Sequence, residues 1–98
     1  MADILQWTTR ALNEYDKLVD YLYAEWGEEI TQRVLNEIDQ TLVRIQNSPQ
    51  QYPVIIKSKK VRRCVASPQT SIFFIIKSNW IEISSVFDNR QNPKKRKL

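Results

Sequence analysis

The sequence predicts an α+β domain: an N-terminal strand, a helical hairpin, and then a three-stranded antiparallel meander, with the helices packed on one face of the sheet. Three observations lead to this prediction. Apolar residues recur at helical spacing from residue 9 to residue 47, and a single glycine, Gly27, interrupts them. Beyond residue 60 the pattern changes to short apolar runs with the period of two that is typical of strands.

The first strand and the first helix are expected to follow each other directly. Residues 3–7 alternate loosely and suit a short strand. Thr8 and Thr9 can then cap a helix, because a hydroxyl oxygen accepts from the free amides of the first turn. The apolar stripe of this helix comprises Ala11, Leu12, Tyr15, Leu18, Val19, Leu22 and Trp26.

A second helix is expected after Gly27, which relaxes the backbone between the two. On its solvent side, Glu29, Arg33 and Glu37 have the spacing of an i, i+4 ladder of charges. Pro49 disfavours a helical conformation for the residue before it and so ends the helix near residue 47. The apolar stripe of this helix comprises Ile30, Val34, Leu35, Ile38, Leu42 and Ile45.

Three strands are expected after a loop that contains Pro49 and Pro53, in residues 60–66, 71–77 and 80–87. The middle run, SIFFIIK, is apolar on both faces, as a central strand would be. Turn residues separate the runs, so the strands form hairpins. The side chains expected in the core include Trp7, Trp26, Trp80 and Cys64.

Length and composition exclude several classes of function. The chain has 98 residues, enough for one domain, and no apolar stretch of roughly 18–20 residues that would span a bilayer. It has no histidine, which excludes Ser-His-Asp catalysis and zinc sites built on imidazole. Its one cysteine and one glycine exclude an internal disulfide, a cysteine cluster and a phosphate-binding glycine loop. We therefore expect a cytoplasmic protein without cofactor or metal.

Charge divides the chain into two halves. Residues 1–47 hold four basic and nine acidic side chains, a net charge of −5, whereas residues 48–98 hold eleven basic and two acidic ones, a net charge of +9. A concentrated positive field attracts phosphate groups or an acidic protein. Two interpretations stay open: a functional cationic face, or acidic helices joined to a basic sheet without further consequence.

Four stretches in this order resemble the RelE/ParE superfamily of bacterial toxins from type II toxin–antitoxin pairs. They are WTTRALNEYDKLVDYL, EWGEEITQRVLNEID, KKVRRCV and EISSVFDNRQNP. Glu25-Trp26-Gly27, with Arg33 six residues after the glycine, is most similar to the ParE and plasmid-stabilisation branch. The resemblance implies one toxin domain over residues 1–98, ending in a short basic tail from about residue 93 to residue 98.

The resemblance also implies a cognate antitoxin and one of two mechanisms. RelE-like toxins cut mRNA in the ribosomal A site, whereas ParE-like toxins poison DNA gyrase and have no known hydrolytic activity. Because both branches share a fold, the fold does not choose between them. From the charge division we expect an acidic segment of the antitoxin to cover the basic half of the chain. A degenerate toxin or a general nucleic-acid or protein-binding module is a further alternative.

Metal-free RNA cleavage needs a base for the ribose 2′-OH, an acid for the leaving oxygen, and cations near the phosphorane-like charge. By resemblance, the basic positions of a ribonuclease would be Lys60, Arg62, Arg63 and Arg90. The position expected to be basic on the next strand falls near Ser71, and no Tyr or His follows Tyr52. A flexible terminal lysine such as Lys94, Lys95 or Lys97 is a poor substitute because it stays protonated.

These departures favour the ParE-like mechanism, in which a shaped cationic surface contacts the target. Its candidate residues are Arg62, Arg63, Arg90, Lys94 and Lys95. Adjacent residues of a strand point to opposite faces, so Arg62 and Arg63 cannot both face one partner. The competing structural interpretation is an ion pair with a carboxylate for either arginine, and a local pair with Asp88 for Arg90.

Overall fold

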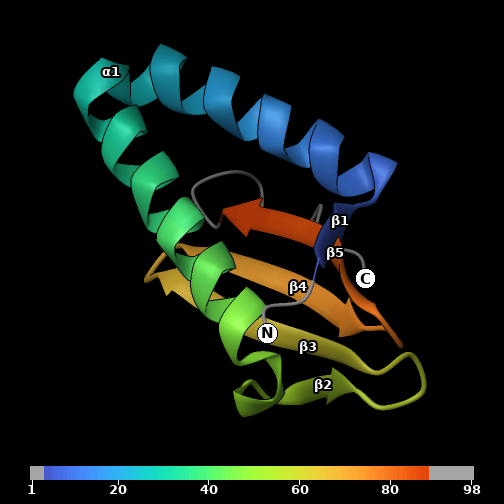
Figure 1. The fold of residues 1–98 in the computed structure, drawn as a ribbon. Helices are drawn as coiled ribbons and strands as arrows, with labels where there is room; N and C mark the ends of the chain where they lie inside the picture. Colours follow the sequence, from blue (N-terminus) through green and yellow to red (C-terminus); the bar gives the residue numbers. More distant parts are fainter. Residues whose placement is uncertain (1–3, 89–98) are drawn as a thin grey trace.

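The computed structural model describes residues 4–88 and has the predicted α+β architecture. A five-stranded sheet is covered on one face by the helical hairpin (Figure 1). In chain order, the elements are β1 (Ile4–Trp7), α1 (Thr9–Asn47), the 3-10 turn η1 (Pro49–Gln51), β2 (Val54–Ile56), β3 (Val61–Ser67), β4 (Thr70–Ile76) and β5 (Trp80–Asp88). No helix among these residues is long and apolar enough to cross a membrane.

The strands lie in the order β1-β5-β4-β3-β2. The predicted meander β3-β4-β5 is antiparallel, and the apolar run of β4 lies in its middle, as expected. The first strand joins the sheet beside the last one and runs parallel to it, with Leu5 opposite Ile81 and Trp7 opposite Ile83. A parallel pair needs a long crossover, and here that crossover begins with the helical hairpin.

The loop expected around Pro49 and Pro53 contains a strand that the sequence analysis did not predict. In β2, Val54 lies opposite Arg62, and Ile56 lies opposite Val61. Three residues are too few to show the alternation of apolar and polar side chains that is typical of a strand. This strand is therefore recognised only from its pairing with β3.

The predicted helical hairpin is confirmed, and the label α1 covers both of its arms. Gly27 has φ 83° and ψ 177°, a conformation that glycine adopts freely, and it separates an arm over residues 9–26 from an arm over residues 28–47. The Thr31 hydroxyl donates to the Gly27 carbonyl at 2.7 Å. The predicted capping role belongs to Thr8, whose Oγ1 accepts from the Ala11 amide at 3.0 Å.

Thr8 and Glu14 fasten the first arm of α1 to β5. The Thr8 amide donates to the Ile83 carbonyl at 3.1 Å, and its hydroxyl donates to the Ser84 carbonyl at 3.2 Å. The register of β5 shifts beside this point, at a bulge. The Val86 amide donates instead to the Glu14 carboxylate at 3.2 Å, so the bulge leaves no unsatisfied donor at this residue.

Apolar side chains cover both faces of the sheet, but the main core lies between the sheet and α1. This core includes Leu18, Leu22, Ile38, Ile45, Ile72, Phe74, Ile81 and Ile83. A smaller cluster on the opposite face consists of Val61, Phe73 and Phe87, with Ile56 and Ile75 packed against them. Cys64 is buried in the main core, as predicted.

Two expectations about α1 are wrong. Trp26, placed in the core by its spacing, is 47% exposed, because the arms diverge from the sheet where they meet at Gly27 (Figure 1). Trp7 and Trp80, by contrast, are partly buried. The charge ladder is also absent from the described residues, since neither Glu29 nor Glu37 forms an ion pair with Arg33.

Replacing Gly27 by alanine is expected to lower the free energy of unfolding by about 1–3 kcal/mol, because a side chain at this φ and ψ strains the backbone. A Cβ atom added at Gly27 would meet no atom within 4 Å, so the loss would come from the backbone and not from packing. Urea denaturation measures the effect. Glu28→Ala, an exposed neighbour, is the control and should change stability by less than about 0.5 kcal/mol.

Candidate functional site

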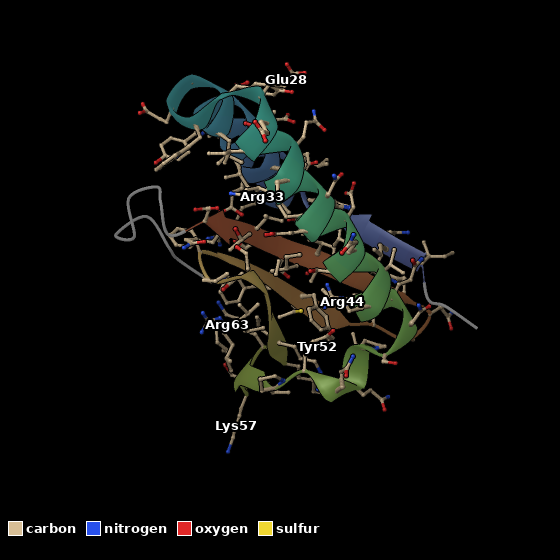
Figure 2. The ribbon with its side chains drawn as sticks, turned by 90° about the vertical axis from the view of Figure 1, so that its left-hand side faces the viewer. Glu28, Arg33, Arg44, Tyr52, Lys57 and Arg63 are labelled. Atoms are coloured by element: carbon tan, nitrogen blue, oxygen red, sulfur yellow. The ribbon has the colours of Figure 1, made fainter. Side chains whose placement is uncertain are left out.

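The turn between β2 and β3 concentrates positive charge at one end of the sheet. Lys57 and Lys60 are exposed there, and the Lys60 amide donates to the Lys57 carbonyl at 3.3 Å. Lys60 adopts a positive φ of 57°, which this tight turn requires. Figure 2 shows the Lys57 side chain extending away from the rest of the molecule. Both ammonium groups are therefore placed to contact a partner.

Arg62 and Arg63 lie on opposite faces of β3, as predicted. Arg62 is in register with Phe74, a residue of the main core beneath α1. Arg63 is in register with Phe73, which belongs to the cluster on the face without helices. A partner that binds one face of the sheet can therefore contact only one of these two arginines.

Arg62 contacts the backbone of the segment that precedes β2. Its Nη1 donates to the Tyr52 carbonyl at 2.7 Å and to the Gln50 carbonyl at 3.3 Å. These bonds tie the 3-10 turn to the sheet, in place of the ion pair that was the alternative interpretation. The Arg62 guanidinium therefore stabilises the local backbone. Because its Nη1 already donates to two carbonyls, this nitrogen is not available to donate to a partner.

Arg63 is half-buried on the face without helices, and its Nε donates to the Ser71 hydroxyl of β4 at 3.1 Å. This bond orients the guanidinium through a partner without charge, so the positive charge is retained. Ser85 lies on the same face of β5, opposite Phe73, with a buried hydroxyl that has no hydrogen-bond partner among residues 4–88. We call Lys57, Lys60 and Arg63 the cationic face.

The side chains of Tyr52 and Cys64 meet on the other side of β3, beneath the end of α1. They interact with each other, and the Tyr52 ring packs edge-on against Phe74, with 5.9 Å between the ring centroids. Burial raises the pKa of both groups, and it outweighs the nearby positive charge of Arg44 (Figure 2). Both groups stay protonated at neutral pH, so neither can act as a general base there.

Some of the residues predicted for the site lie among these groups, and others do not. Lys60 and Arg63 lie where a partner can reach them, whereas Arg90, Lys94 and Lys95 are outside the described residues. The competing interpretation of Arg90, a local pair with Asp88, lies outside the described residues for the same reason. Asp88 itself is buried and accepts from the Thr70 hydroxyl at 2.7 Å.

Two contacts of the site lacked a clear sequence signal. The bond from Arg63 to Ser71 depends on the register of the β3-β4 hairpin. The predicted turn at residues 67–70 indicated the hairpin but not this register. The contact between Tyr52 and Cys64 depends on the strand β2, which has no periodicity to reveal it. No group of three His, Cys, Asp or Glu side chains in the described part of the chain could hold a metal ion.

The free energy of unfolding is expected to fall as the pH rises above about 9. Burial raises the pKa of Cys64 from its ordinary value of 9.0, and those of Tyr15 and Tyr52 from 10.0. The folded state therefore holds these protons more tightly than the unfolded chain does. Binding of these protons therefore contributes fully to stability below the ordinary pKa values. This contribution is lost as the pH rises through the higher pKa values of the folded state.

Urea denaturation at a series of pH values tests this expectation with the variant Cys64→Ala. The variant should lose the part of the alkaline decline that begins near pH 9 and keep the part that begins near pH 10, where the tyrosines titrate. An identical decline in both proteins would contradict the role assigned to Cys64.

Comparison with solved structures supports the fold. The chain resembles a protein of the chromosomal ParDE toxin–antitoxin system from Pseudomonas aeruginosa, with a TM-score of 0.73, 21% identity, and coverage of 89% of this chain and 96% of that chain. It also resembles a conserved hypothetical protein from Helicobacter pylori (TM-score 0.60, 20% identity, coverage 90% and 96%). A copper-bound mutant toxin from the same organism has a TM-score of 0.56, 20% identity, and coverage of 92% and 98%.

The sequence comparison identifies the family. No curated protein sequence matches the chain significantly. The sequence profile described as the ParE toxin of the type II toxin–antitoxin system parDE, however, matches residues 5–93. This match covers nearly the whole chain and agrees with the order of elements in the structure. The chain therefore belongs to the ParE toxin family of type II toxin–antitoxin systems.

Proposed function

We propose that this toxin acts in the cytoplasm by inhibiting DNA gyrase, and that the cationic face contacts its target. The observation that carries the proposal is the environment of Arg63, a charged guanidinium oriented by Ser71 on the face of the sheet without helices. The described side chain that orients it, Ser71, is neutral, so the charge of Arg63 is available to a partner. Inhibition by binding requires only such a surface.

Neither Tyr52 nor Cys64 is placed to act as a general base beside Arg63. Tyr52 and Cys64 stay protonated at neutral pH, because burial raises their pKa values, and both lie on the opposite face of β3 from Arg63. Residues 89–98 contain no histidine, tyrosine or acidic side chain. This stretch therefore supplies no imidazole, phenol or carboxylate side chain for proton transfer near the ribose.

A RelE-like, ribosome-dependent endoribonuclease is the second candidate, with a degenerate toxin or a binding module as a further one. The observation that favours the ribonuclease is the run of basic residues Lys60, Arg62 and Arg63 at the start of β3. Against it stands the division of the two arginines between opposite faces.

Purified protein added to a gyrase supercoiling assay and to a translating extract separates these candidates. Gyrase inhibition predicts a loss of supercoiling with intact mRNA. Cleavage of mRNA near the ribosomal A site, without an effect on supercoiling, would reject the gyrase proposal in favour of the ribonuclease. A protein that is inactive in both assays would support a degenerate toxin or a binding module.

Arg63→Gln is expected to raise the concentration needed to inhibit supercoiling by about tenfold or more, because a hydrogen bond to a charged group contributes about 1.5–3 kcal/mol. Lys17→Gln is the matched control, since it removes one exposed positive charge from α1 and should inhibit as the unaltered chain does. Arg63→Lys should recover part of the effect by restoring the charge without the planar guanidinium. Equal inhibition by Arg63→Gln and the unaltered chain would place the target surface elsewhere.

The antitoxin is proposed to bind the basic half of the chain with an acidic segment. Ending the chain at Asn92 removes four positive charges, those of Lys94, Lys95, Arg96 and Lys97. This truncation should weaken antitoxin binding much more at low salt than at high salt, because salt screens exposed charges. Titration calorimetry at two salt concentrations measures the difference, and an equal loss at both would argue against an electrostatic role for these residues.

A further inference from the structure

The two arms of α1 meet at a tip that exposes large aromatic side chains. We define the hairpin tip as residues 20–32. Within it, Tyr23 is 43% exposed and Trp26 is 47% exposed, and they lie on the same arm, less than one helical turn apart. The tip is the bend in the middle of α1, which projects away from the sheet (Figure 1), although Leu22 and Thr31 within it are completely buried. A turn that only reverses the chain has no need of an exposed tryptophan.

Contacts between the arms hold the tip in one shape. Gln32, on the second arm, donates from Nε2 to the Tyr23 hydroxyl at 3.1 Å. Thr31 donates to the Gly27 carbonyl at 2.7 Å and so fixes the first turn after the kink. Because these bonds orient the Tyr23 ring and the kink before any partner arrives, less conformational entropy is lost when the tip binds.

The charge of the tip is of one sign. Residues 20–32 contain four acidic side chains and no basic one, and none of the four forms an ion pair with a described residue: Asp20, Glu25, Glu28 and Glu29. Figure 2 shows Glu28 at the opposite end of the molecule from Lys57. The tip is therefore remote from the cationic face and opposite to it in charge.

This chemistry excludes several kinds of partner. Unpaired carboxylates repel the phosphates of nucleic acids and of anionic lipid headgroups. An acidic antitoxin segment is repelled in the same way. A protein segment that carries arginine or lysine is attracted, because its cation can lie over an aromatic ring while the carboxylates neutralise its charge. Exposed tyrosine and tryptophan are also the side chains that most often dominate protein interfaces.

We propose that the hairpin tip is a docking surface for a basic protein segment, with the Trp26 and Tyr23 rings as its apolar contacts and the surrounding carboxylates as its charge partners. This surface is additional to the cationic face and does not depend on the target of the toxin. Because the two surfaces are remote and opposite in charge, the toxin binds an acidic partner at one end and a basic partner at the other.

A defined peptide tests the proposal on the full chain. The probe is a synthetic peptide of about twelve residues in which arginine alternates with alanine, and the matched probe has glutamate in place of arginine. NMR titration follows the indole N–H signal of Trp26, and calorimetry measures the affinity. The arginine peptide should bind saturably, shift the Trp26 signal and bind more weakly as salt increases, whereas the glutamate peptide should leave this signal unchanged.

Variants at the tip and away from it locate the binding. Trp26→Ala and the double change Glu28→Gln with Glu29→Gln should each weaken binding of the arginine peptide at least tenfold. The matched controls are Val43→Ala, an exposed apolar residue of the second arm, and Asp39→Asn, an exposed acid of the same arm, and neither should change the affinity. All the substituted side chains are exposed, and circular dichroism verifies that each variant is folded.

Two results would overturn the proposal. One is an unchanged affinity in Trp26→Ala and in the double variant, or peptide-induced shifts confined to residues outside the tip. The other is self-association of the chain that these substitutions abolish while the peptide fails to bind, which would make a second copy the occupant. The peptide measurement does not involve gyrase. A negative supercoiling assay would therefore reject the gyrase proposal alone, and absent peptide binding would reject the docking proposal alone.

Discussion

The fold depends on covering one apolar face of the inner strands β4 and β5. The side chains of Ile72, Phe74, Ile81 and Ile83 on this face of β4 and β5 are completely buried. Each such side chain contributes about 1.5–3 kcal/mol when it leaves water, so an uncovered face would remove most of the driving force for folding. The two arms of α1 provide the cover with Leu18, Leu22, Ile38 and Ile45. Gly27 allows both arms to reach the same face, because it accepts a backbone conformation that other residues reach only with strain.

This constraint also decides where the basic side chains lie. Successive residues of a strand alternate between faces, so the burial of Cys64 beneath α1 places Arg62 on the helical side and Arg63 on the other. On the helical side, Arg62 is used to bind the backbone of the turn before β2. On the other side, Arg63 keeps its charge and is oriented by a neutral serine. The candidate surface for a target is thus a consequence of the same packing that forms the core.

The hairpin gives the molecule two poles of opposite charge. The acidic arms meet at a tip that carries Trp26 and four carboxylates without an ion pair to any described residue, and the turn between β2 and β3 carries exposed lysines at the other end. Within about 10 Å, charges interact strongly at physiological salt, and beyond that distance they are largely screened. Separation of the poles therefore prevents them from neutralising each other. A toxin that is controlled by one protein and acts on another can use such an arrangement to keep the two contacts apart.

The sequence by itself was sufficient to predict the features that depend on neighbouring residues. The limits of α1, its break at Gly27 and the meander of three strands are correct, because helical and strand periodicity, capping and proline act over a few residues. The division of Arg62 and Arg63 between two faces followed from alternation alone. The net charges of the two halves were also predictable, because they follow from the numbers of acidic and basic residues.

Only the tertiary structure decided the features that join distant parts of the chain. These are the parallel pairing of β1 with β5, the short strand β2, the contact between Tyr52 and Cys64, and the exposure of Trp26. Trp26 has the spacing of a core residue, and yet the arm leaves the sheet before reaching it. Periodicity shows which side of a helix is apolar, but it does not show how far along the helix the partner surface extends. That distance is set by the length of the sheet and the angle between the arms, which no local pattern contains.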